Sequence, residues 1–156
     1  MTLTGGCVCG EVRYEVTDNP LFVHACHCTD CQRSSGSAFI VNVLVDEHHF
    51  DVTGATSVVT LPTPGGTGYD AYFCPNCATI VWCNYHFIHP SLLNLRGGTL
   101  DDANAVSPSA HIFTCSKQAW LMMPEGVPCF DEMYDPVKAW PEDTSEKFAE
   151  MSLRNA

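Results

Sequence analysis

The chain has 156 residues, of which 46% are hydrophobic, so it is long enough for a hydrophobic core and too apolar to be a disordered segment. It carries 18 Asp and Glu against 7 Lys and Arg, a formal net charge of −11. The cations are scattered, whereas nucleic acids and anionic membranes select clustered basic residues, so we expect neither as a partner. At this length we expect a single domain over residues 1–156.

No apolar stretch approaches the roughly 20 residues of a membrane-spanning helix. Residues 1–7 lack the basic and apolar regions of a signal peptide, so we expect a cytoplasmic protein. In a reducing compartment its ten cysteines are predicted to be metal ligands or free thiols, with a disulfide framework as the alternative. The oligomeric state does not follow from the sequence.

Apolar alternation and short apolar runs predict a chain of strands, at residues 11–16, 21–25, 38–45, 52–61, 69–73, 79–85, 92–95 and 111–115. Gly54 interrupts one of them, and residues 62–68 are predicted to be loop. One helical turn is expected at residues 29–35 and a helix start at 100–102. Proline makes the last third irregular, except for a helix at 143–153 capped by one of its first three residues. The predicted fold is mainly β, with little helix apart from this short C-terminal one.

Seven cysteines fall in three tight clusters: Cys7 and Cys9; Cys26, Cys28 and Cys31; Cys74 and Cys77. A zinc ion bound by four thiolates needs sulfurs roughly 3.8 Å apart. Two cysteines separated by one residue of a strand, or by two residues of a tight turn, meet that spacing. The first and last clusters together supply four ligands, which indicates a closed structural site that clips the N-terminal strand to the middle of the chain and contributes to folding.

The middle cluster supplies three thiolates and no fourth cysteine at motif spacing. Three protein ligands with an open position are typical of a catalytic zinc, where a thiolate or water completes the coordination. A fourth ligand that closes the site is the alternative, with His24, His27, Cys83 and Cys115 as candidates, and a different partition of the thiols stays open. We therefore expect two zinc ions per chain, the second of them potentially labile.

The clusters and their neighbours resemble the glutathione-dependent formaldehyde-activating family, which also contains centromere protein V. The resemblance is carried by Gly6-Cys7-x-Cys9-Gly10-x-Val12-Arg13-Tyr14, Cys26-His27-Cys28-x-x-Cys31-x-x-x-x-Gly36-x-Ala38-Phe39, Cys74-x-x-Cys77 and His111-Ile112-Phe113-x-x-Ser116-Lys117-x-x-Trp120. It spans residues 5 to about 134 and leaves 135–156 as a C-terminal tail with the short helix.

The resemblance implies an Mss4-like fold of several coiled antiparallel β-sheets around a structural zinc on Cys7, Cys9, Cys74 and Cys77. It also implies a catalytic zinc on Cys26, Cys28 and Cys31. The implied activity is that of a carbon–sulfur lyase similar to S-(hydroxymethyl)glutathione synthase, which adds a zinc-activated thiol, glutathione or a similar one, to formaldehyde or another small aldehyde. A non-catalytic, zinc-stabilised binding module with the same fold is the alternative.

Glutathione is anionic and this chain is acidic, so binding would need local cations, for which Arg33 and Lys117 are the candidates. His27 lies between two expected ligands and is predicted to support them or face solvent, and His111 to be a structural histidine. Cys83, Cys115 and Cys129 are most simply buried small hydrophobes. Ala78 follows the last cysteine cluster where the family usually has glycine, a position that often needs a positive φ.

Overall fold

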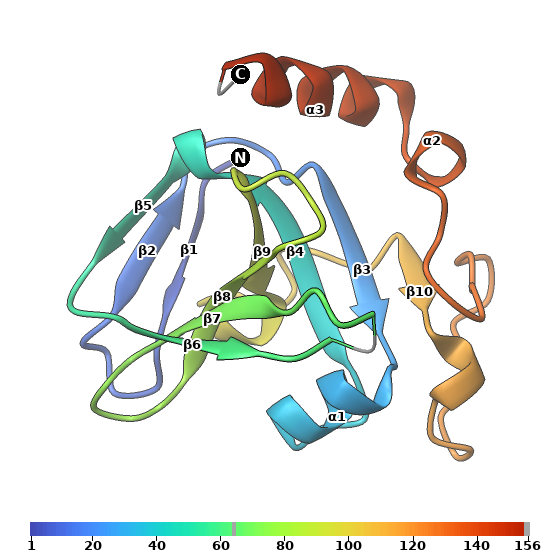
Figure 1. Ribbon diagram of the computed structural model, residues 1–156, viewed down its shortest axis with the longest axis horizontal. Helices are drawn as coiled ribbons and strands as arrows, with labels where there is room; N and C mark the ends of the chain where they lie inside the picture. The colour runs from blue at the N-terminus through green and yellow to red at the C-terminus, as the bar shows by residue number, and fades with distance from the viewer. Residues whose placement is uncertain (64, 155–156) are drawn as a thin grey trace.

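The computed structural model describes residues 1–63 and 65–154 and is mainly β, with two sheets and little helix, as the sequence predicts (Figure 1). The strands are β1 (Leu3–Gly6), β2 (Arg13–Val16), β3 (Phe22–Cys26), β4 (Ile40–Asp46), β5 (Phe50–Thr53), β6 (Ser57–Leu61), β7 (Tyr69–Phe73), β8 (Ile80–Tyr85), β9 (Leu92–Arg96) and β10 (Ala110–Ile112). The α-helices are α1 (Thr29–Ser35), α2 (Pro136–Ala139) and α3 (Glu142–Arg154), and the 3₁₀ turns are η1 (Glu47–His49), η2 (Gly97–Thr99) and η3 (Thr114–Ser116).

Three strands form the smaller sheet, in the order β1-β2-β5, and seven form the larger, in the order β10-β3-β4-β9-β8-β7-β6. All pairings are antiparallel except that of β10 with β3, which is parallel. Because β10 begins more than eighty residues after β3, this pair is made by a long return of the chain rather than by a hairpin. It brings the segment that follows β10 beside the end of β3.

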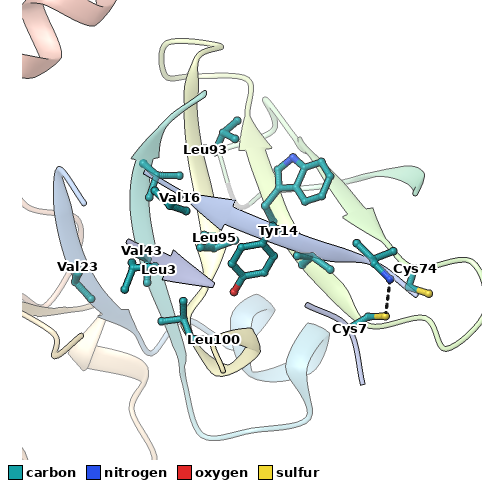
Figure 2. Close-up of a cluster of buried hydrophobic side chains, with 14 residues drawn as sticks. Leu3, Cys7, Tyr14, Val16, Val23, Val43, Cys74, Leu93, Leu95 and Leu100 are labelled. Carbon is teal, nitrogen blue, oxygen red and sulfur yellow. Dashed lines mark hydrogen bonds between the residues drawn. The ribbon is translucent and has the colours of Figure 1, made fainter. Parts of the chain in front are cut away.

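The smaller sheet packs on one face of the larger, and their inward side chains form the main core (Figure 2). Tyr14 and Val16 of β2 meet Val43 of β4 and Leu95 of β9 there. These positions follow the strict alternation of the sequence, because successive residues of a strand face opposite sides. Cys7 and Cys74 lie at the edge of the same core (Figure 2).

The opposite face of the larger sheet carries a second core, which the C-terminal third of the chain covers. Phe22 and Leu44 of the sheet pack there with Tyr134 and with Met151 of α3. Ion pairs from α3 to Asp18 and Asp46 hold the helix over this face. None of the helices in the described part of the chain is long and apolar enough to cross a membrane.

The predicted strand at 52–61 is two strands in different sheets, β5 and β6, separated at Gly54. The φ of Gly54 is 88°, and a Cβ at this residue would lie 2.0 Å from the carbonyl oxygen of Glu11. Only glycine fits this position, so the interruption seen in the sequence is the point where the chain leaves one sheet for the other.

Three local predictions need correction. No helix starts at 100–102, because Leu100 forms a β-bridge with Gly5 after the 3₁₀ turn η2. The strand predicted at 111–115 ends at Ile112, because Phe113 adopts a left-handed conformation with φ 55°. The C-terminal helix forms as predicted but begins at Glu142, so Asp143–Ser145 lie in its first turn rather than at its cap, and Thr144 donates instead to the carbonyl of Leu21.

Candidate metal centres

The sulfur atoms of Cys7, Cys9, Cys74 and Cys77 lie within 4.8 Å of one another. Cys7 follows β1 directly, and Cys74 follows β7 at the turn into β8, so the group joins the two sheets. The Cys7–Cys9 and Cys9–Cys74 sulfur distances are 3.4 Å and 3.7 Å. These values are close to the edge of a zinc–thiolate tetrahedron, so this four-cysteine group could hold a metal ion of that coordination.

Backbone N–H groups prepare the four-cysteine group for anionic sulfur. Val12 N–H donates to the sulfur of Cys7 at 3.2 Å. Hydrogen bonds from the hydroxyl and the backbone N–H of Thr79 lower the pKa of Cys77 to about 5. Ala78 has a φ of 59°, as predicted for this position, and its N–H donates to the carbonyl of Cys74 at 2.8 Å. The left-handed residue therefore closes the turn between Cys74 and Thr79, although alanine is strained there.

The sulfur atoms of Cys26, Cys28 and Cys31 also lie within 4.8 Å of one another. Cys26 ends β3, Cys28 is the N-cap of α1, and Cys31 lies inside that helix. The Cys28 sulfur accepts the N–H of Cys31 at 3.3 Å, which is the ordinary capping contact made here by a thiol. Cys26 and Cys31 are buried, whereas Cys28 is half-buried and is the member of this three-cysteine group that solvent reaches.

The three thiols are unequal in acidity. Hydrogen bonds from Cys26 and Cys31 lower the pKa of Cys28 far below its usual range, although partial burial opposes them. The same contacts raise the pKa of Cys26, which acts as a donor. Cys28 is therefore the sulfur that ionises first, and a divalent cation would be needed to hold all three as thiolates.

No fourth Cys, His, Asp or Glu joins the three-cysteine group within residues 1–63 and 65–154. His24 is hydrogen-bonded on both ring nitrogens, to Tyr134 and Asn42. Cys83 contacts Arg96 instead, and Cys115 is exposed. Three of the four candidates that the sequence suggested for the fourth coordination position are therefore engaged elsewhere or exposed.

His27 is completely buried, so the prediction that it could face solvent does not hold. Its Nε2 lies 2.8 Å from Nδ1 of His111, a contact between residues 84 positions apart. Burial lowers the pKa of His27, with His111 adding to the effect, and burial also lowers the pKa of His111. The Nδ1 of His27 has no hydrogen-bond partner. The parallel β10–β3 pairing creates this neutral histidine pair under the cysteine loop.

The three cysteines outside the two groups differ in burial. Cys83 is buried as predicted, but Cys115 and Cys129 are exposed, so their interpretation as buried hydrophobes is wrong. Both lie in the irregular segment after β10, where apolar periodicity gives no guide to burial.

Outside the cysteine loop, a groove of about 520 Å³ is lined by Gln32, Arg33, Gly36, Ser37, Ala38, Phe39, Gln118 and Trp120. Trp120 donates to the amide oxygen of Gln118 at 2.7 Å, and Gln118 donates to Gln32 at 3.3 Å. Gln32 in turn donates to the carbonyl of His27 at 2.7 Å. A chain of side-chain amides thus connects the groove with the backbone between Cys26 and Cys28.

The two predicted substrate cations differ in position. Arg33 lines the groove with its side chain 82% exposed, and its guanidinium lies 4.0 Å from Asp30. Lys117 does not line the groove and donates instead to the carbonyl of Leu121 at 3.1 Å. Of the two, only Arg33 is placed to meet a molecule in the groove.

One polar group was missed at the level of sequence. His24, Asn42 and Arg96 lie opposite one another on β3, β4 and β9, and Nη1 of Arg96 donates to the Asn42 oxygen at 2.8 Å. The signal in the sequence was a single polar residue within each of two apolar strands, His24 in β3 and Asn42 in β4. Alternation groups residues by face, but it does not say which face of the sheet other segments cover.

The sequence profile of one protein family, described as glutathione-dependent formaldehyde-activating enzyme, matches residues 2–116, which include all seven clustered cysteines. A protein of Halomonas elongata with the provisional name glutathione-dependent formaldehyde-activating enzyme is 32% identical over 127 residues, 78% of this chain and 80% of the relative. A crystal structure of a Rhodobacter sphaeroides protein covers 67% of this chain and 91% of its own, at 19% identity and a TM-score of 0.48. At that score the structural likeness carries no further weight.

Proposed function

Because the chain belongs to the glutathione-dependent formaldehyde-activating family, we propose that it is an enzyme that joins a small thiol to a small aldehyde at the three-cysteine group. The first substrates to consider are glutathione and formaldehyde. In that reaction the thiol sulfur bonds to the carbonyl carbon, and the carbonyl oxygen becomes a hydroxyl that takes the thiol proton. The reverse reaction breaks the same carbon–sulfur bond and is a lyase reaction.

The observation that carries this proposal is the three-cysteine group itself, with no fourth ligand among the described residues and with Cys28 reachable from solvent. Its thiol donors and its sulfur spacing fit a zinc ion, and the four-cysteine group fits a second. Zinc bound by the three cysteines would supply the positive charge that keeps a substrate thiol in its thiolate form near neutral pH.

The chain's own residues would orient the thiol. The groove contains no carboxylate among its lining residues, although the chain as a whole carries 18 acidic residues. Arg33 would attract a substrate carboxylate there, and the amides of Gln32 and Gln118 would meet peptide groups. Charge complementarity in an otherwise acidic protein therefore favours an anionic, amide-bearing thiol such as glutathione.

The test begins with zinc and free thiols counted per chain on protein purified under reducing conditions. The exchange between free formaldehyde and its glutathione adduct is then followed by NMR, with the spontaneous rate subtracted, for the wild type and for Cys28→Ser. We expect close to two zinc ions and an exchange that the wild type alone accelerates. Two bound zinc ions with no acceleration would contradict the proposal and favour a non-catalytic, zinc-stabilised binding module.

A further inference from the structure

The side chain of Arg96 is a buried cation without an anionic partner. It is 7% exposed, and its guanidinium donates to the Asn42 oxygen at 2.8 Å and to the Cys83 sulfur at 3.0 Å. In the part of the chain that the structure describes, no carboxylate oxygen lies within 4.0 Å of it. Burying an unpaired charge is unfavourable, because the charge loses its hydration without gaining a partner, so a compensating anion is expected nearby.

The groups around Arg96 are neutral. Burial raises the pKa of the Cys83 thiol even though Arg96 opposes it, so this sulfur stays protonated. Burial likewise raises the pKa of Tyr69 and Tyr85, whose rings stack with centroids 4.9 Å apart. Burial lowers the pKa of His24 to about 4, and Arg96 adds to this. Among the described residues, the two side-chain hydrogen bonds of Arg96 therefore leave its charge without an anionic partner.

The three-cysteine group lies on the same side of the larger sheet as Arg96. Arg96 is opposite Asn42, and Asn42 is opposite His24, which is two residues before Cys26. Side chains two residues apart on a strand share a face, so Arg96 and Cys26 are on the same covered face. Burial lowers the pKa of Arg96, whereas negative charge on nearby groups, a Cys31 thiolate among them, raises it.

We propose that Arg96 is the buried countercharge of the three-cysteine centre. Three thiolates and a divalent cation leave one net negative charge, and a substrate thiolate in the free position adds another, inside a region of low dielectric. Arg96 offsets this charge from the side of the sheet without ligating the metal. Arg96 would thus act as a positioning residue. This inference depends on a metal ion at the three-cysteine centre, which the proposed function also needs, but not on which thiol or aldehyde reacts.

Asn42→Asp is the sharpest test, because it keeps the shape and the oxygen that accepts from Arg96 while giving that cation a carboxylate of its own. His24 can donate to this carboxylate through its other tautomer. Co²⁺ and Zn²⁺ are titrated into the metal-free full chain against a competing chelator, and cobalt–thiolate absorption separates the two centres. Outer partners of metal sites typically contribute about 10- to 100-fold in affinity, so we expect a loss of at least about tenfold at the three-cysteine centre and none at the four-cysteine centre.

Arg33→Gln is the matched control. It removes a cation two residues from Cys31 whose side chain is 82% exposed and therefore screened by water, so both metal affinities should stay at their wild-type values. If Asn42→Asp binds both metals as tightly as the wild type, the proposal is wrong.

Arg96→Lys and Arg96→Gln decide the question if Asn42→Asp does not fold. Lysine keeps the charge and glutamine removes it, so affinity at the three-cysteine centre should follow charge, with only the glutamine variant weakened. Equal affinities in the two variants would overturn the proposal. These readouts do not depend on turnover, so a wild type that binds two metals but lacks activity would refute the proposed function and leave this inference standing.

Discussion

The two cysteine groups are built from the same side chain in different ways, and we propose different roles for them. The four-cysteine group draws its ligands from two distant points of the chain, 65 residues apart between Cys9 and Cys74, and joins the two sheets. The three-cysteine group draws its ligands from one loop and helix, and every other candidate ligand is engaged elsewhere or exposed. A centre that closes on itself holds the fold, whereas one that leaves a position free can exchange a ligand.

Cys77→Ser should have the largest effect, because it removes a ligand from the centre that joins the sheets. Structural zinc contributes on the order of 10 kcal/mol in small domains, comparable with the whole stability of a protein of this size. We expect insoluble or unfolded, zinc-poor protein, measured by soluble yield, circular dichroism and zinc content. A folded variant with an unchanged melting temperature would break the distinction between the two groups.

Cys28→Ser should separate folding from activity. The variant is expected to fold, to keep the metal of the four-cysteine group, and to lose the other. Its rate enhancement should fall by more than about 100-fold, because a ligand matters more than the outer partners that already account for about 10- to 100-fold. Thermal unfolding and metal counts on the same sample check this. If this variant unfolds while Cys77→Ser does not, the roles of the two groups are reversed.

Ala78→Gly should strengthen the four-cysteine group. Alanine at φ 59° is strained by about 1–2 kcal/mol, while glycine adds roughly 0.5–1 kcal/mol of unfolded-state entropy. We expect a net gain of about 0.5–1 kcal/mol in the free energy of unfolding by urea, with activity unchanged. Ala149→Gly in the exposed part of α3 is the control and should instead lose about 1 kcal/mol. A loss for both variants would show that the turn is not strained.

Arg33→Gln should have the smallest effect. An exposed ion pair contributes less than about 1 kcal/mol, so we expect KM for glutathione to rise about three- to fivefold with kcat unchanged. Lys117→Gln, whose amine contacts the carbonyl of Leu121 outside the groove, should leave KM alone. Steady-state kinetics at two salt concentrations would check both, since the effect of Arg33 should shrink with salt. The reverse ranking would move the substrate away from the groove.

Features encoded over a few residues were predictable. Apolar alternation and short apolar runs predicted most strands, and the C-terminal helix appears within one residue of its predicted start and end. The positive φ of Ala78 was expected from the family resemblance, because the family usually has glycine there. Each cysteine cluster belongs here too, because a spacing of one or two residues lets sulfurs of the same cluster approach one ion, although the meeting of Cys7 and Cys9 with Cys74 and Cys77 needed the tertiary structure. Such features depend on local backbone geometry, which distant residues change little.

What the tertiary structure decided depends on contacts between distant segments. Residues 52–61 divide between two sheets because the backbone of Glu11 leaves no room beside Gly54. His27 meets His111 only because β10 returns parallel to β3. Arg96 carries a charge, which usually keeps a residue at the surface, but it is buried and donates to Asn42 of β4 and Cys83 of β8, residues distant in the sequence. The sequence by itself thus determined which cysteines are candidate metal ligands, whereas their partition into two groups and the burial and charge around each group follow from packing, which is a property of the whole chain.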